Sequence, residues 1–297
     1  MRRSPARLFI ALALTGPLSG CLQHQGTTRG GTPPAAGGGA TPHSGRYAED
    51  RDSTPATPPD LSKIPEPVPK TEPPSQYGNK SPYTVLGESY RVLPSCKGYD
   101  ERGIASWYGN KFHGYMTSDF ERYDMYAYSA AHKTLPLPCY VRVTNLENGR
   151  SVVVRVNDRG PFVPNRVIDL SYVAAVKIGV WPKGTALVEV RGIDPDHPER
   201  ATAEPSRERA VSTPPQKTPN PTLYLQVGAY ADAANAERAA AKVRAAHLGD
   251  VHVVAATVDG RLVHRVRLGP LKDVDETDRL TPRLKALGLG EPIVAVE

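Results

Sequence analysis

The chain carries the sequence SVVVRVNDRGPF at residues 151–162, a strand pattern that runs into a turn. Valines at every second position give this strand one apolar side that can pack in a β core. The Gly160-Pro161 pair turns the chain just after Asp158, so a carboxylate is presented where a strand meets a loop. Aspartate is also common in turns because it caps them locally. The motif therefore leaves two readings for Asp158, a functional acid or a turn cap.

Short strands separated by turn signals surround this motif. The sequence ENG at residues 147–149 joins two of them through an Asn-Gly pair typical of hairpins. Ser171 can cap a short helix over residues 172–178. Strands are expected over residues 104–108, 125–130, 140–145, 151–156, 166–170 and 187–190. The pattern indicates a small, mainly β domain.

Several motifs follow one another in this region: GIASWYG at 103–109, FHG at 112–114, YDM at 123–125, AHKTLP at 131–136, VRVTNL at 141–146 and VNDRGPF at 156–162. Together they resemble rare lipoprotein A, a bacterial family of septal lytic transglycosylases. The resemblance implies an all-β, six-stranded double-psi β-barrel, which we place at residues 101–193 behind a lead-in segment at 83–100.

The same resemblance points to Asp158 as the proton-transferring carboxyl, with Glu121, Asp124 and His132 lining the catalytic site. Carboxylates suit glycan cleavage because the leaving oxygen needs a proton and the oxocarbenium-like sugar needs a nearby negative charge. In a lytic transglycosylase the C6 hydroxyl of muramic acid attacks in place of water, so one carboxyl that acts first as acid and then as base can suffice. Relatives often have Gly before the glutamate, whereas this chain has SDFE at 118–121. The loop that carries Glu121 therefore departs from the family pattern.

Tyr108, His113 and Arg159 are the candidates for substrate binding in the barrel, although aromatic side chains in a small barrel more often belong to its core. Asp169 lies between two apolar residues and is expected to be structural. His113 and His132 lack the close spacing with Cys or Asp partners that metal sites need. We therefore predict neither a metal nor another cofactor.

Residues 1–20 have the features of a lipoprotein signal peptide. A basic start, an apolar run over residues 8–14 and the sequence LSGC at 18–21 follow one another, and the run is too short for a permanent membrane span. Cys21 is the predicted lipidation site, and its acyl chains would tether the protein to a membrane at about 0.8 kcal/mol per buried methylene. The residue after Cys21 is not aspartate, which favours the outer membrane. Residues 21–82, rich in Pro, Gly, Ser and Thr, are expected to be a disordered linker.

Two further cysteines, Cys96 and Cys139, would lie in an oxidising compartment after secretion. We expect a disulfide that joins the lead-in to the strand beginning at Cys139, and two separate buried thiols are the alternative. Nucleophilic catalysis by Cys139 with His132 lacks any recognisable protease context.

From residue 222 the pattern changes to strand, helix, strand, strand, helix, strand, which is a split βαβ arrangement. The sequences QVGAY at 226–230 and VRLGP at 266–270 resemble the SPOR domain, a module similar to ones that bind peptidoglycan stripped of stem peptides. The resemblance implies a small α+β, ferredoxin-like domain over residues 222–297, behind a Pro-rich linker at 194–221. Gln226, Tyr230 and Arg267 are its candidate glycan contacts.

The formal charge of +6 is compatible with nucleic-acid binding, but a secretion signal removes that substrate. Two functions remain: a lytic transglycosylase that cuts stem-peptide-free glycan during daughter-cell separation, and a non-catalytic, expansin-like wall protein. The combination of acidic residues with His132 favours the enzyme. The expected partners are denuded glycan strands and the membrane, with divisome proteins as further candidates. The expected location is the periplasmic side of the outer membrane, enriched at the division septum.

Overall fold

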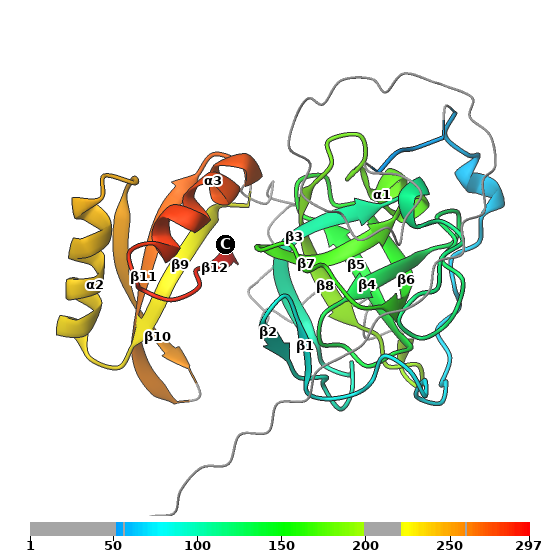
Figure 1. Ribbon diagram of the computed structural model, residues 1–297, viewed down its shortest axis with the longest axis horizontal. Helices are drawn as coiled ribbons and strands as arrows, with labels where there is room; N and C mark the ends of the chain where they lie inside the picture. Colours follow the sequence, from blue (N-terminus) through cyan, green and yellow to red (C-terminus); the bar gives the residue numbers. More distant parts are fainter. Residues whose placement is uncertain (1–51, 56, 199–220, 259) are drawn as a thin grey trace, which may run out of the picture. The chain divides into compact units, whose positions relative to one another are not determined.

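The computed structural model describes residues 52–55, 57–198, 221–258 and 260–297 (Figure 1). The predicted signal peptide, Cys21, the linker as far as residue 51 and nearly all of the linker at 194–221 lie outside these residues. Within the described ranges, no helix has the length and apolar character needed to cross a bilayer.

Six strands close into a barrel in the spatial order β3-β7-β4-β6-β5-β8. The strands are β3 (Asp100–Tyr108), β4 (Ser129–His132), β5 (Cys139–Asn145), β6 (Ser151–Asp158), β7 (Arg166–Ser171) and β8 (Ala186–Gly192). The β3–β7 and β4–β6 pairs are parallel and the other pairs are antiparallel. This arrangement confirms the predicted six-stranded barrel.

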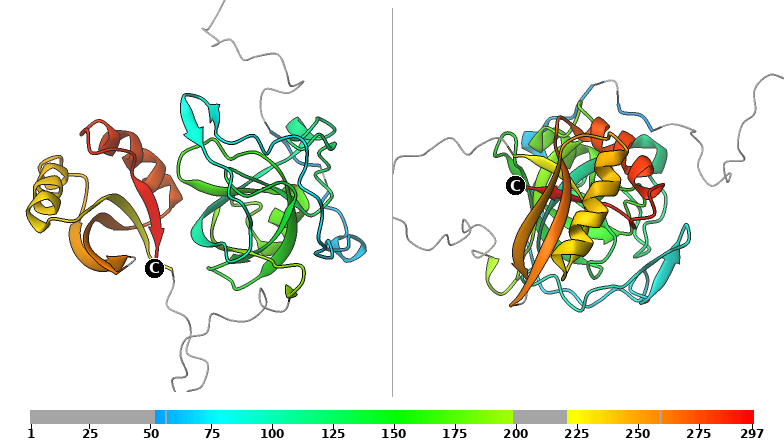
Figure 2. Two further views of the ribbon diagram at one scale, coloured as in Figure 1. Left: turned by 90° about the horizontal axis from the view of Figure 1, so that it is seen from below. Right: turned by 90° about the vertical axis from the view of Figure 1, so that its left-hand side faces the viewer.

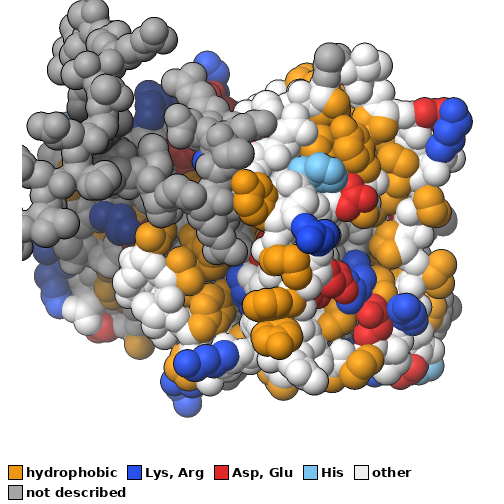
Figure 3. Space-filling view, turned by 45° about the vertical axis from the view of Figure 1, so that its right-hand side comes forward, with side chains coloured by type: hydrophobic (Ala, Val, Ile, Leu, Met, Phe, Trp, Pro, Cys, Tyr) orange, Lys and Arg blue, Asp and Glu red, His pale blue; other side chains and the backbone are white. Residues whose placement is uncertain are grey.

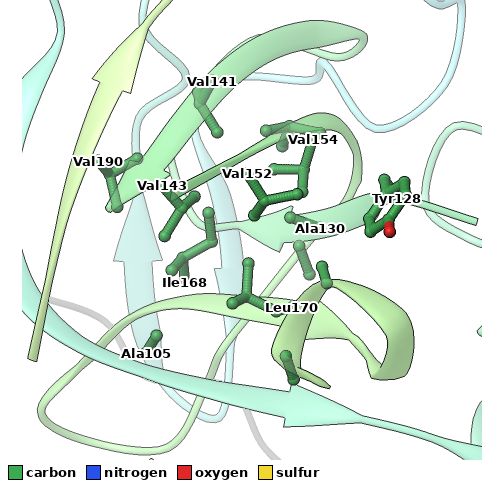
Figure 4. Close-up of a cluster of buried hydrophobic side chains, with 14 of the residues drawn as sticks. Ala105, Tyr128, Ala130, Val141, Val143, Val152, Val154, Ile168, Leu170 and Val190 are labelled. Carbon is green, nitrogen blue, oxygen red and sulfur yellow. The ribbon is translucent and has the colours of Figure 1, made fainter. Parts of the chain in front are cut away.

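The barrel core is built from the alternating apolar residues that the strand patterns indicate. In β6 the side chains of Val152, Val154 and Val156 are at most 1% exposed. Valines of β5 and β8 and the Ile168 and Leu170 side chains of β7 meet them (Figure 4). Full burial of one such side chain contributes on the order of 1.5–3 kcal/mol, so the inward-facing set holds the barrel closed.

Helix α1 (Tyr172–Ile178) follows β7 as predicted and buries most of its side chains against the barrel. It ends where Gly179 adopts the left-handed conformation, with φ of 78° and a backbone N–H that bonds the last helical carbonyls. The helix therefore closes one end of the barrel.

The strand expected over residues 125–130 begins later, at Ser129. Before it, the backbone N–H of Met125 donates to His113 Nδ1 at 3.2 Å, and that of Ala127 donates to the Asp124 carbonyl at 3.1 Å. These bonds make a loop of residues 124–128. The predicted strand was wrong over residues 125–128. Met125 and Tyr128 are buried although they belong to a loop, and burial alone does not identify a strand.

Residues 57–82, here called the strap, were predicted to be disordered, and this prediction was wrong. The strap contains the short helix η1 (Leu61–Lys63) and bonds to the barrel through polar side chains. Glu66 accepts the backbone N–H of Val153 at 2.9 Å, and Asn79 exchanges two hydrogen bonds with the backbone of Leu137. Leu61 and Ile64 of the strap also pack against the barrel core. Composition missed the order of the strap because most of its contacts are hydrogen bonds and ion pairs, which a count of apolar residues does not reveal.

The lead-in forms a short hairpin of β1 (Tyr83–Val85) and β2 (Glu88–Tyr90). The helix η2 (Asn110–Phe112) follows β3. Both are polar segments at the barrel surface, and no residue of these three short elements is fully buried.

The C-terminal domain has the predicted order of elements. They are β9 (Leu223–Tyr230), α2 (Ala233–Ala245), β10 (Val251–Val258), β11 (Arg261–Leu271), α3 (Val274–Lys285) and β12 (Ile293–Val296). The sheet order is β10-β11-β9-β12, and every pair is antiparallel (Figure 2). The α+β plan is therefore confirmed.

Both helices of this domain begin at an aspartate. Asp232 accepts the backbone N–H of Asn235 at 2.9 Å, and Asp273 accepts that of Glu276 at 2.8 Å. The predicted break at Pro282 was wrong, because α3 continues through it to Lys285. The buried Leu280 and Leu284 hold this helix on the sheet, which offsets the one hydrogen bond that proline cannot make.

Candidate active site

Asp158 lies at the end of β6 and its carboxylate is partly accessible. One oxygen, Oδ1, accepts the backbone N–H of Ser118 at 2.8 Å, the Ser118 hydroxyl at 2.6 Å and the backbone N–H of Arg159 at 2.7 Å. The bond from Arg159 is the local turn cap. The two bonds from Ser118 come from a distant loop, so Asp158 is positioned by more than its own turn.

The loop at residues 117–121 is organised around Asp119, which the sequence analysis did not single out. Its Oδ1 accepts the Thr117 hydroxyl at 2.8 Å and the backbone N–H of Glu121 at 3.2 Å. Burial raises the pKa of the Asp119 carboxyl, and the hydrogen bond from Thr117 opposes that shift. Asp119 thus shapes the loop that carries both Ser118 and Glu121.

Glu121 reaches the same strand as Asp158. Its exposed carboxylate accepts Arg155 Nη1 at 2.6 Å and Asn157 Nδ2 at 3.1 Å. The structure therefore brings Glu121 and Asp158 to one end of β6, as predicted. Phe120, the residue before Glu121, has φ of 69° and packs against Tyr77 of the strap with ring centroids 4.2 Å apart.

Arg155 joins this loop to the strap. Its Nε and Nη2 donate to the two oxygens of Glu72 at 3.0 Å each, while Nη1 donates to Glu121. Burial alone would lower the pKa of Arg155, but the hydrogen bonds to Glu72 and Glu121 raise it. The guanidinium stays charged and acts as a bidentate clamp.

Asp124 and His113 form a separate exposed pair. Asp124 Oδ1 accepts the backbone N–H of Tyr126 at 2.9 Å and lies 3.8 Å from His113 Nδ1. These contacts hold Asp124 in its own turn instead of joining it to Asp158.

One face of the protein shows acidic, basic and histidine side chains among hydrophobic ones (Figure 3).

His132 is buried and shapes the turn after β4. Its Nδ1 accepts the backbone N–H groups of Thr134 and Leu135 at 3.1 and 3.0 Å, and its Nε2 lies 2.9 Å from the Tyr99 hydroxyl. Burial, followed by the charges of Arg159 and Lys133, lowers the pKa of His132 to about 3. A neutral ring with both nitrogens engaged is a structural histidine, so the prediction that His132 lines the site does not fit this geometry.

Arg159 and Tyr108 are also committed to the fold. The Arg159 guanidinium donates to the carbonyls of Gly78 and His132 at 2.8 and 3.1 Å. Tyr108 is 7% exposed and stacks on Tyr123 with centroids 4.0 Å apart. The buried Tyr108 is not open to a sugar face, so its predicted substrate contact does not fit this geometry. Arg159 is half-buried, and its contact with substrate stays a prediction.

Asp169 lies near Asp158, although its sequence context suggested a purely structural role. Its Oδ1 accepts the Ser106 hydroxyl, and the side chain keeps partial solvent access. Burial raises its pKa to about 6, against the opposing hydrogen bond from Ser106.

Among the described residues, no group of three or more His, Cys, Asp or Glu side chains forms a metal-ligand set.

Comparison with known proteins matches two regions of the chain. Residues 100–190 match the family described as "Lytic transglycolase", and residues 219–295 match the SPOR domain. The "Endolytic peptidoglycan transglycosylase RlpA" of Pseudomonas aeruginosa (strain UCBPP-PA14) is 41% identical over 286 residues, covering 82% of this chain and 83% of that protein. The chain belongs to the rare lipoprotein A family.

Another family member, from Vibrio cholerae serotype O1, is 43% identical and covers 84% of this chain and 89% of its own length. The crystal structure of the RlpA SPOR domain from Pseudomonas aeruginosa is 36% identical, with a TM-score of 0.24, and covers 25% of this chain and 96% of that one. The similarity to this family thus includes the barrel and the C-terminal domain.

Of the three cysteines in the sequence, Cys96 and Cys139 lie in the described part of the chain, where they are buried free thiols and not a disulfide. The two thiols lie side by side. Hydrogen bonding with Cys96, followed by burial, raises the pKa of Cys139. Cys96 Sγ also lies 3.9 Å from the carbonyls of Tyr140 and Ile193. The bridge stays a prediction for the oxidised protein.

The candidate glycan contacts of the SPOR domain lie on β9 and β11 but do not all share one face of its sheet. Gln226 pairs with Arg267 across β9 and β11, and Tyr230 pairs with His264 on the same strands. The alternate residues Leu223, Leu225 and Val227 are buried in the core on the other side of β9. The register of the ladder shifts between Val266 and Arg267, and such a bulge changes the face to which the following side chains point. Gln226 therefore lies on the face away from that core, whereas Tyr230 packs against the core. Arg267 is 7% exposed and forms an ion pair with Glu297.

Proposed function

We propose that this protein is a lytic transglycosylase that cleaves peptidoglycan glycan strands, with a preference for strands that lack stem peptides. The observation that carries the proposal is the Asp158 carboxylate, held at the end of β6 by both the backbone and the hydroxyl of Ser118. Membership of the rare lipoprotein A family and the names of its relatives support the same chemistry.

In this proposal Asp158 exchanges a proton at the glycosidic bond that is cut. Cleavage needs proton transfer to the glycosidic oxygen and removal of a proton from the C6 hydroxyl that attacks the anomeric carbon. Glu121, fixed by Arg155 and Asn157 at the same end of β6, would orient the sugar beside Asp158. Asp124 and His113 form an exposed pair on a neighbouring loop and would contact the glycan further from the bond that is cut.

The SPOR domain supplies affinity for stripped glycan through Gln226, Tyr230 and Arg267. Acylation at Cys21 would keep the protein at the outer membrane, facing the periplasm. Enrichment of denuded glycan at the division septum would then place the barrel where daughter cells separate. This location makes divisome proteins candidate partners.

The test is incubation of the mature protein in detergent with peptide-free glycan strands, followed by mass analysis. Anhydro-muramic ends support a lytic transglycosylase, whereas ends that have gained water indicate a hydrolase. Unchanged strands that are nevertheless bound would favour the non-catalytic, expansin-like alternative.

A further inference from the structure

A second carboxyl lies on the same face of the barrel as Asp158. Ala131 of β4 pairs with Asp158 in the parallel β4–β6 ladder and with Asp169 in the antiparallel β4–β7 ladder. Residues paired across neighbouring strands share a face of the sheet. Asp158 and Asp169 therefore flank the small Ala131 side chain, with their backbones two strand spacings, or roughly 10 Å, apart.

The turn after Asp158 leaves room beside Asp169. Gly160 has φ of 143°, and a Cβ built on it would lie 3.7 Å from Ala131 Cβ and 3.9 Å from Asp169 Oδ2. A side chain at this position would therefore pack against Oδ2. Oδ1 of Asp169 is occupied by the Ser106 hydroxyl, so Oδ2 is the oxygen that can meet a substrate.

The two carboxyls have different surroundings. Asp158 accepts three hydrogen bonds at one oxygen, two of them from backbone N–H groups, which suits a charged carboxylate. Asp169 receives the single hydroxyl of Ser106, and its pKa is raised to about 6, first by burial. Pairs of titratable groups in such contrasting environments divide acid and base roles between them.

Charged and titratable groups face Asp169 from each neighbouring strand. Arg166 of β7 and Lys133, just after β4, favour its ionised form, while Asp158 of β6 favours its protonated form. Tyr108 of β3 is buried beside the two carboxyls, and burial, followed by the charge of Asp158, raises the pKa of its phenol.

We propose that Asp169 is a second catalytic residue, the general acid that protonates the glycosidic oxygen while Asp158 removes the proton from the C6 hydroxyl. This inference rests on the proposed function. The Asp169 proton goes to the leaving oxygen as the bond from that oxygen to the anomeric carbon breaks, and the bonding electrons leave with the oxygen. The C6 oxygen then bonds to the anomeric carbon and its proton goes to Asp158. Return of that proton to Asp169 through solvent restores the pair, so no other reactant is consumed.

The first test is Asp169→Asn, which keeps the size of the side chain and an oxygen for Ser106. Loss of a general acid should lower the release of anhydro-muramic products by at least about 10²-fold, with thermal unfolding and glycan binding unchanged. Asp100→Asn is the matched control, because this exposed β3 carboxylate pairs only loosely with Arg191, at 3.4 Å. It should retain wild-type activity.

Near-normal product release by Asp169→Asn, from a preparation whose wild type forms anhydro-muramic ends, would overturn the role of Asp169 and leave the proposed function intact. A wild-type protein that forms no such ends would instead remove the proposed function.

A second variant keeps the inference testable if Asp169→Asn does not fold. The Ser106 hydroxyl lowers the pKa of Asp169 by stabilising its charged form, so Ser106→Ala should raise that pKa. A general acid works while protonated, so kcat/KM should fall as the pH rises through about 6 in the wild type. In Ser106→Ala this fall should occur at higher pH. An unchanged profile would show that Asp169 is not the acid.

Discussion

Asp158 makes the sharpest residue-scale prediction. Asp158→Asn preserves the size of the side chain and can still accept the bonds from Ser118 and Arg159, but it cannot take a proton from a hydroxyl. Product release should therefore fall by about 10²- to 10⁴-fold, while folding and glycan binding persist. Mass analysis of anhydro-muramic ends and a thermal melt measure the two effects. If Asp158 were only a turn cap, Asn would serve almost equally well and the variant would stay active.

The roles of single residues were only partly predictable from the sequence, because the sequence does not show which groups each side chain contacts. The family resemblance implied that Glu121 lies near Asp158, and in the structure the Glu121 carboxylate bonds Arg155 and Asn157 of the same strand. His132 was misjudged because its Nδ1 partners are backbone N–H groups, which no side-chain pattern reveals. Asp169 was taken as structural because apolar neighbours say nothing of which oxygen stays accessible. Ser118 and Asp119 carried no signal at all.

At the scale of elements, the strap should be held by Glu72. Its carboxylate bonds Arg155 twice and also accepts the Tyr140 hydroxyl. Glu72→Gln removes the charge and the bidentate geometry, and hydrogen bonds to charged groups are worth about 1.5–3 kcal/mol each. Because both partners keep about a fifth of their side-chain exposure, 19% each, we expect a loss near the lower end of that range. Limited proteolysis within the strap and urea unfolding of the barrel measure the change.

Asp60→Asn is the matched control for the strap, because Asp60 bonds only to Ser62 and Lys63 nearby. It should leave proteolysis unchanged. Equal protease resistance of the wild type and Glu72→Gln would show that the strap does not depend on the Arg155 clamp.

A second prediction at this scale concerns a disulfide between two elements, because Cys96 precedes β3 and Cys139 begins β5. If the neighbouring thiols oxidise after export, periplasmic protein unfolded without reductant should show neither thiol to a titrant. The closed loop of about forty residues would add roughly 3–4 kcal/mol in the chain-entropy model. Two titratable thiols in that material would mean that the reduced arrangement of the structure persists.

Strands with a strict alternation of buried and exposed residues were predicted well from the sequence. Segments held by polar contacts, or buried without being strands, were not. Strands β5 and β6 follow from their alternation, because every second side chain enters the core. Strand β4 was misplaced because Met125 and Tyr128 are buried from a loop. The strap was missed because its order depends on carboxylate and amide contacts with the barrel, which composition does not encode.

At the scale of the whole molecule, the C-terminal domain should act as a targeting module by itself. It has its own buried core between the sheet and both helices, with Leu225, Leu268 and Leu284 at most 1% exposed. Residues 222–297 should therefore fold when exported alone to the periplasm. Gln226 and Arg267 share a face of the sheet, so the isolated domain should bind stripped glycan without the barrel.

Stripped glycan is expected to be enriched where daughter cells separate, so a fluorescent fusion of residues 222–297 should gather at division sites. The variant Gln226→Ala is suited to test the face, because its side chain lies away from the core and its loss should weaken binding without unfolding the domain. Lys242→Ala, on the exposed side of α2, is the control and should localise normally. Binding to amidase-treated wall in a pull-down gives the same comparison in solution. A uniform periplasmic signal together with no binding to treated wall would show that the domain does not recognise denuded strands, and targeting would then have to come from the barrel or from the anchor at Cys21.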